Sequence, residues 1–185
     1  MPDLPRTAHT LLGFLTWGPM SGYDLKKIID SSTRNFWNES YGQIYPTLKR
    51  LYERGLVERS DESGDGARKR HVYAITQAGR DELQSWLEIA PERQPPRVEM
   101  LLKLFFGNEL GVEKSIEYVE SYRAEVMDEM ASYAEIRPAL EAASQSQRAP
   151  RFWLMTLRYG ERKNESLIAW CDEVLAELRD MEVNP

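Results

Sequence analysis

Apolar residues recur at helical spacing in three segments of the first 55 residues. The first segment, 7–17, stops at a Gly-Pro pair, and the second, 21–31, starts at a serine suited to an N-cap. The third segment, 42–54, carries one apolar stripe and is followed by Gly55, which is typical of a helix end. Pro46 would clash inside a regular helix, so we expect it in an opening or irregular turn. The pattern predicts three helices, the last of them amphipathic.

After the third helix the pattern changes to one typical of strands. Residues 56–60 and 71–75 are rich in β-branched and aromatic side chains, and the glycine-containing segment 61–70 between them can turn back. Thr76 is a suitable cap for a fourth helix, whose apolar positions continue to Ala90. The order helix, helix, helix, strand, strand predicts a winged helix-turn-helix domain over residues 1–90.

The second half of the chain is predicted to be helical. Residues 91–97 contain three prolines and read as a linker. Within 98–185, a dense apolar run at 100–106 precedes a long amphipathic pattern, which Pro138 should kink or end. A polar break at 144–150 then leads to a last helix of about 30 residues.

These predicted helices carry more apolar surface than they can bury among themselves. Two long helices and one short one leave the 100–106 run exposed to water, and the long pattern resembles a coiled coil. Association with a second copy of the chain is the simplest way to bury this apolar surface. The fold class is therefore mainly α, with a winged helix-turn-helix domain and a C-terminal helical, coiled-coil-like dimerisation domain.

The composition is that of a globular protein, with 42% hydrophobic and 29% charged residues in a chain of 185. No stretch has the pattern of a signal peptide or a membrane span, which favours a cytoplasmic protein with no membrane partner. Cys171 is the single cysteine and is expected in the core. The chain has only two histidines besides this cysteine, too few ligands for a structural zinc, which is therefore excluded. No motif indicates another cofactor or a catalytic pair of side chains, so we do not expect an enzyme.

Net charge alone argues against nucleic acid, because the chain carries −6 at pH 7. The excess of acid lies entirely in the second half, since residues 1–90 hold 12 basic and 12 acidic side chains. Basic residues of the first half gather in the helix 42–54 and in the segment 61–70. Solvated surfaces in both halves would also explain this distribution, so charge leaves both interpretations open.

The outward side of the predicted helix 42–54 carries groups that bind DNA. Gln pairs with adenine edges and Arg with guanine edges, so Gln43 and Arg50 are the candidate base readers. Thr and Lys more often hold phosphate, and tyrosine can stack or bond to the backbone. The predicted DNA-binding residues of this helix are Tyr41, Gln43, Tyr45, Thr47, Lys49 and Arg50.

A structural interpretation of the same side chains stays open beside the functional one. Tyr45 and Tyr52 could pack under the hairpin, and Arg50 could make a surface ion pair.

The segment 61–70 between the two predicted strands is expected to contact the DNA backbone or minor groove as one electrostatic patch, without reading the base sequence. Its basic residues are Arg68, Lys69 and Arg70. Acidic neighbours would weaken its phosphate contacts, and these are Asp61, Glu62 and Asp65.

Four segments carry a specific combination of motifs: SGYDLKKII at 21–29, GQIYPTLKRL at 42–51, GL at 55–56 and VYAITQAGRDEL at 72–83. The combination resembles the PadR family of bacterial and archaeal transcriptional regulators over the first 90 residues. The resemblance implies a winged helix-turn-helix in which the Gln43 region and the basic hairpin contact operator DNA. It also implies a homodimer made by the C-terminal helices. The chain departs from the family at Ala74, where a polar or basic residue is expected.

Five tryptophans are many for 185 residues, and three of them are candidates for an effector pocket. Trp17, Trp86 and Trp153 are placed by the sequence where domains or chains should meet. Because the resemblance implies a response to small aromatic or lipophilic compounds, we expect such a ligand to change the spacing of the two DNA-reading helices. The alternative is that these indoles are structural core.

The sequence thus predicts a ligand-responsive transcriptional regulator, expected to be a repressor, that binds double-stranded DNA as a homodimer on a palindromic operator. The alternative is a winged-helix adaptor that binds a protein and no DNA, for which the net charge of −6 is no obstacle.

Overall fold

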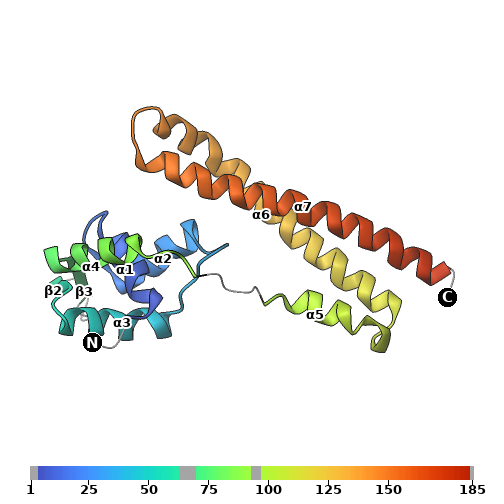
Figure 1. The fold of residues 1–185 in the computed structure, drawn as a ribbon, viewed down its shortest axis with the longest axis horizontal. Helices are drawn as coiled ribbons and strands as arrows, with labels where there is room; N and C mark the ends of the chain where they lie inside the picture. The colour runs from blue at the N-terminus through green and yellow to red at the C-terminus, as the bar shows by residue number, and fades with distance from the viewer. Residues whose placement is uncertain (1–3, 63–69, 93–96, 184–185) are drawn as a thin grey trace. The chain divides into compact units, whose positions relative to one another are not determined.

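The computed structural model describes residues 4–62, 70–92 and 97–183. The chain forms two compact units, Met1–Arg93 and Gln94–Pro185 (Figure 1).

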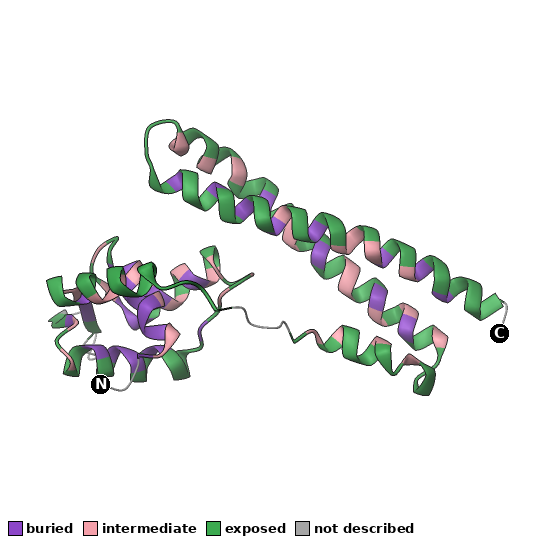
Figure 2. Cartoon of the chain, viewed as in Figure 1, coloured by how far each residue is buried: buried purple, intermediate pink, exposed green. Residues whose placement is uncertain are grey.

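Helices of the first unit enclose a single apolar core. Helix α1 spans Arg6–Leu15, α2 spans Gly22–Ser32, α3 spans Tyr41–Glu53 and α4 spans Gln77–Glu88. The inward stripes of α1, α2 and α3 are buried (Figure 2). Side chains with no exposed surface are Ala8, Leu11, Leu12, Leu25, Ile29, Ile44, Leu48 and Leu51.

Strands β1 (Met20–Ser21), β2 (Val57–Glu62) and β3 (Arg70–Ile75) form an antiparallel sheet in the order β1-β3-β2. The hairpin β2–β3 was predicted from its strand-like pattern. Strand β1 was not, because two residues carry no detectable alternation and are held only by their pairing with β3. With three helices before the hairpin, the unit is a winged helix-turn-helix, and the predicted fold class is confirmed.

Two predicted helix caps are confirmed. The Ser21 hydroxyl accepts from the Asp24 N–H, and the Ser21 N–H donates to the Asp24 carboxylate, which together make a capping box. The Thr76 hydroxyl accepts from the Gly79 N–H at 3.1 Å.

Glycine at position 79 is a packing requirement, because a Cβ there would lie 2.1 Å from the Leu56 carbonyl oxygen. The start of α4 therefore lies directly on the backbone that leads into β2.

The second unit is a long helical hairpin preceded by a short helix and a 3-10 turn. Helix α5 spans Glu99–Phe105, a 3-10 turn covers Gly107–Glu109, and α6 (Val112–Ser144) packs along α7 (Ala149–Val183) (Figure 1). Cys171 is fully buried in the α6–α7 core with Val119 and Leu175, as predicted.

Both prolines expected to disturb helices lie inside them. Pro46 is in the second turn of α3 rather than in an opening or irregular turn, and α6 continues past Pro138 to Ser144. A proline costs a helix about 3 kcal/mol, and packing of α3 and α6 against their neighbours outweighs that local cost.

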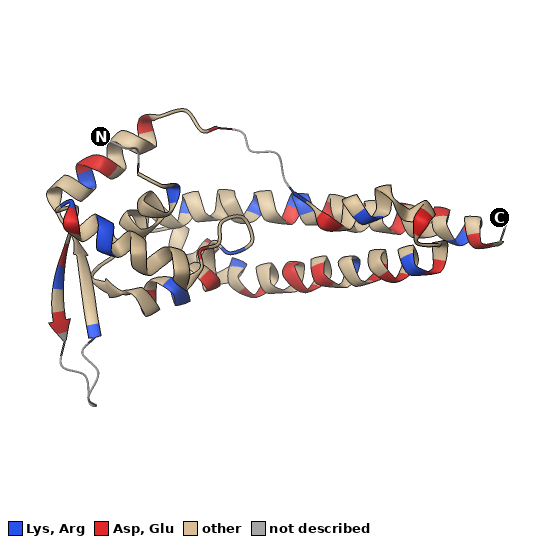
Figure 3. Cartoon of the chain, turned by 90° about the horizontal axis from the view of Figure 1, so that it is seen from below, with Lys and Arg blue, Asp and Glu red and all other residues tan. Residues whose placement is uncertain are grey.

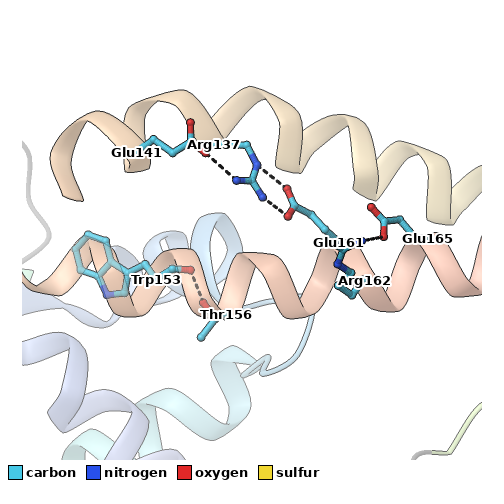
Figure 4. A network of polar contacts seen from close by, with 7 residues as sticks. All are labelled: Arg137, Glu141, Trp153, Thr156, Glu161, Arg162 and Glu165. Atoms are coloured by element: carbon cyan, nitrogen blue, oxygen red, sulfur yellow. Dashed lines mark hydrogen bonds and ion pairs between the residues drawn. The ribbon is translucent and has the colours of Figure 1, made fainter. Parts of the chain in front are cut away.

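Arg137 of α6 makes two ion pairs, one to Glu161 of α7 and one to Glu141 of its own helix. Arg137 donates from Nε to Glu161 Oε1 at 2.9 Å and from Nη1 to Glu141 Oε1 at 2.8 Å (Figure 4). These two carboxylates raise the pKa of the Arg137 guanidinium further above its usual value. Among the described helices, none has the length and hydropathy that a membrane span requires.

Candidate nucleic-acid interface

Burial of the Ile44, Leu48 and Leu51 stripe leaves a second side of α3 in solvent. Five of the six predicted DNA-binding residues of this helix are exposed, and they are Tyr41, Gln43, Tyr45, Lys49 and Arg50. An amphipathic helix with amide, guanidinium, ammonium and phenol groups on its free side has the chemistry to contact bases and phosphates.

Thr47 is the exception, since only 7% of it is exposed. At 100° per residue, Thr47 lies about 40° from Leu51 around the helix axis, so it belongs to the edge of the buried stripe. Thr47 therefore does not lie on the outward side of α3, and the prediction that it holds phosphate stays a prediction.

Gln43 has a partner within the protein. The Ser40 N–H and the Ser40 hydroxyl both donate to Gln43 Oε1, each at 2.9 Å. Ser40 and Gln43 form the S-x-x-Q pattern of a helix N-terminus, a signal that sequence reasoning could have used. Bidentate reading of adenine needs the same amide oxygen, so base reading by Gln43 competes with capping of α3.

Two tyrosines make an aromatic ledge at the start of α3. The rings of Tyr41 and Tyr45 stack with centroids 6.0 Å apart and planes 20° from parallel. The Tyr45 ring also lies on Gly22 of α2, where a Cβ would come within 2.6 Å of Tyr45 Cε1. The ledge is therefore positioned by both helices, and it stays about half exposed.

Tyr52 contacts the hairpin, since the Arg59 guanidinium of β2 lies 4.9 Å from its ring centroid, and 44% of Tyr52 stays exposed.

The cations of α3 differ in their partners. Lys49 Nζ lies 3.8 Å from Glu53 Oε1, and both side chains are more than half exposed. In the described part of the chain, the Arg50 side chain has no ion-pair partner, so the structural alternative for Arg50 finds no support. Arg50 is thus the cation of α3 whose charge is available to a ligand.

Carboxylates lie beside the described basic residues at the ends of the hairpin strands, where β2 finishes and β3 begins. Arg70 pairs with Asp24 of α2, and His71 Nδ1 lies 2.7 Å from Asp61 Oδ1 across the hairpin. Basic and acidic residues both occur on β2, whereas β3 carries a basic residue at its start and no acidic one (Figure 3). Arg68 and Lys69 lie outside the described residues, so their predicted role in a cationic patch stays a prediction.

Asp24 was not among the predicted site residues, although S-x-x-D at 21–24 is a capping pattern. Partial burial would raise the pKa of the Asp24 carboxyl, but hydrogen bonds from Ser21 and the Arg70 guanidinium outweigh it and leave that pKa below its usual value. The carboxylate is therefore kept charged beside Arg70.

A buried carboxylate fixes the chain just before α3. Glu39 is 3% exposed, and it accepts hydrogen bonds from Thr7 Oγ1 at 3.0 Å and from Trp37 Nε1 at 2.9 Å. These bonds tie the loop between α2 and α3 to α1, and so hold the N-terminus of α3 in place.

The three tryptophans of the predicted effector pocket are partly exposed. Trp17 packs edge-on against Phe14 with centroids 5.2 Å apart, and Trp86 stacks on His9 at 4.8 Å. Trp153 is 39% exposed on α7 of the second unit. A pocket that joins these residues stays a prediction.

Two family descriptions match the chain, one for each unit. "Transcriptional regulator PadR-like family" covers residues 11–85, and "Virulence activator alpha C-term" covers residues 96–179.

Curated relatives match along nearly the whole chain. A probable transcriptional regulator of Mycobacterium tuberculosis is 30% identical, over 93% of this chain and 97% of the relative. The negative transcriptional regulator PadR of Bacillus subtilis is 27% identical, over 91% of this chain and 94% of the relative.

Solved structures share the fold. The Vibrio cholerae virulence activator AphA aligns with a TM-score of 0.73 and 31% identity, over 95% of this chain and 99% of that one. Bacillus subtilis PadR in complex with operator DNA aligns with a TM-score of 0.76 and 21% identity, over 94% and 99% of the two chains. The same protein in complex with p-coumaric acid aligns with a TM-score of 0.70 and 23% identity, over 97% and 99%.

Proposed function

The chain belongs to the PadR-like family of transcriptional regulators, and we propose that it controls transcription by binding operator DNA as a homodimer. The observation that carries this proposal is the free side of α3, where Arg50 and the tyrosine ledge are exposed on a winged helix-turn-helix. Bacillus subtilis PadR, which shares the fold, has been crystallised with operator DNA.

In this proposal α3 enters the major groove. Arg50 reads a guanine edge, Lys49 and the tyrosines contact the backbone, and Gln43 reads adenine if it releases Ser40. The hairpin β2–β3 lies along the backbone or in the minor groove, where Arg68 and Lys69 supply the attraction.

The second unit supplies the dimer contact. Its exposed apolar side chains include Leu102, Phe105 and Phe106, which are 59%, 82% and 57% exposed in the single chain. Such surface is unfavourable in water and is covered when two copies associate. A two-fold dimer would present its two α3 helices roughly 34 Å apart, which requires a palindromic operator.

A small aromatic or lipophilic effector is proposed to release the DNA. Bacillus subtilis PadR has been crystallised with p-coumaric acid, and this chain has partly exposed indoles at Trp17, Trp86 and Trp153. Binding that favours one spacing of the α3 helices would shift the dimer away from the operator. Quenching of tryptophan fluorescence by a panel of phenolic acids, drugs and dyes tests this part; no response from any compound contradicts it.

The direction of control is proposed to be repression, in line with the name of the Bacillus subtilis relative. The proposed site of action is the cytoplasm.

Selection of bound duplexes from a random pool tests the DNA proposal. We expect enrichment of one palindrome whose half-sites are one helical turn apart. A pool that stays random after repeated rounds would contradict it and would favour the protein-binding adaptor instead.

A further inference from the structure

We propose that Asp24 withholds Arg70 from DNA, so that Arg70 positions the hairpin against α2 and adds little to phosphate binding. The inference rests on the proposed function and deepens it, because it assigns the cations of the interface to two different roles.

The strand register brings the two residues together. Met20 and Ser21 of β1 pair with Tyr73 and Val72 of β3 in antiparallel order. The chain beyond Ser21 therefore runs past the residues that precede Val72, and it does so as the first turn of α2. Asp24 in that turn meets Arg70 at the start of β3, and the two form an ion pair.

The Asp24 carboxylate is held in place by Ser21, independently of Arg70. Its Oδ2 accepts from the Ser21 N–H at 3.0 Å and from the Ser21 hydroxyl at 2.8 Å, and a carboxylate is favoured at a helix N-terminus. An exposed ion pair is usually weak, since both side chains must be ordered to form it. Here the carboxylate is already ordered, so only Arg70 loses freedom.

The pair reduces the charge that the hairpin offers to a phosphate. Asp24 and Arg70 are 36% and 50% exposed, so a duplex meets them as a neutral pair. Binding salt dependence reports the number of phosphates that cations neutralise, with a slope of about 0.9 per contact. Arg50, which has no ion-pair partner among the described residues, is the natural comparison.

Anisotropy titrations of the full-length protein across a salt series test the inference. The probes are a fluorescein-labelled duplex from the promoter of its own gene and an unrelated duplex of equal length. The variants are Asp24→Asn, Arg70→Gln, Asp24→Asn with Arg70→Gln, and Arg50→Gln. Asp81→Asn is the matched charge control, because Asp81 accepts from Gln77 on α4 and faces no hairpin cation in the described structure. Circular dichroism checks that each variant folds.

Asp24→Asn is expected to steepen the salt slope by about 1.8 per dimer, since two arginines are released, and to strengthen binding to both duplexes. Arg70→Gln in the Asp24→Asn background should cancel that gain. Arg70→Gln alone should change the slope far less than Arg50→Gln, and Asp81→Asn should leave it unchanged.

Two results overturn the inference while DNA binding persists: an unchanged slope for Asp24→Asn, or a loss for Arg70→Gln as large as that for Arg50→Gln. Absence of binding by the unaltered protein to either duplex is a different result, because it overturns the proposed function itself.

Discussion

Gln43 and Asp24 occupy the same place in their helices, the third residue, and each bonds back to the serine that precedes the helix. Sequence reasoning assigned Gln43 by the chemistry of its amide, which gives no information about a competing partner. The serine three residues earlier gives that information in both helices. At this scale, the type of side chain predicts what it can bind, and its near neighbours decide how free it is to do so.

Capping and base reading by Gln43 are separable by substitution. Gln43→Glu keeps an acceptor for Ser40 and removes the donor that adenine needs, whereas Gln43→Ala removes both. We expect Gln43→Ala to lose about 0.5–1 kcal/mol of stability and Gln43→Glu to lose little. Both should lower the ratio of affinities for operator and unrelated duplex. An unchanged ratio for both variants would refute the reading role.

The pH dependence of stability reports on Asp24. Its pKa is lowered in the folded protein, so its contribution is present above the unfolded pKa, about 3.9, and is lost as pH falls through the folded value. Urea unfolding should therefore find the unaltered protein more stable than Asp24→Asn at pH 7, and the difference should vanish in acid. A difference that is constant with pH would contradict this assignment.

Helices were predicted from the sequence because their apolar period is local. The period placed α1, α2, α3, α4, α6 and α7, and it marked the stripe of α3 that is buried. The sequence-based prediction fails where contacts between distant residues determine the secondary structure. Strand β1 exists because it pairs with β3, and α6 continues past Pro138 because it packs along α7. Thr47 was misplaced because it borders the stripe, where the period alone does not determine exposure.

Contact between α4 and the backbone before β2 gives a prediction for the first unit. Gly79→Ala should destabilise the protein by about 1–3 kcal/mol, because the new Cβ meets the Leu56 carbonyl oxygen. Gly13→Ala is the matched control in α1, where a Cβ meets nothing within 4 Å, and it should stabilise by about 0.5–1 kcal/mol. Denaturant unfolding measures both, and equal effects in the two helices would contradict the packing argument.

At the scale of the whole chain, the proposed roles of the two units, DNA contact and dimerisation, follow the distribution of charge and apolar surface between them. The first unit exposes cations and tyrosines on α3, and the second exposes apolar side chains on α5 and α7. Sequence predicted this division from the distribution of acid and from the dense run at 100–106. It could not reveal which cations are already paired, since Arg70 and Asp24 are 46 residues apart.

Dimerisation is tested on the exposed side of α5. Phe105→Asp should weaken the dimer, because Phe105 is 82% exposed in the single chain and a charge there disfavours burial against a second copy. Phe105→Leu keeps an apolar side chain at the same position, so it is the matched control and should leave association nearly unchanged. Sedimentation velocity at micromolar concentration measures the association state of both variants. A stable monomer for the unaltered protein would contradict the dimer proposal.

The central claim is that the free side of α3 docks on duplex DNA. Binding of a labelled duplex from the promoter of its own gene, measured as salt is raised, tests it most directly. Log affinity is expected to fall linearly with log salt concentration, with a shallower slope when Lys49 and Arg50 are both replaced by Ala. No binding of any duplex in dilute buffer, or an identical slope for that double variant, would contradict it.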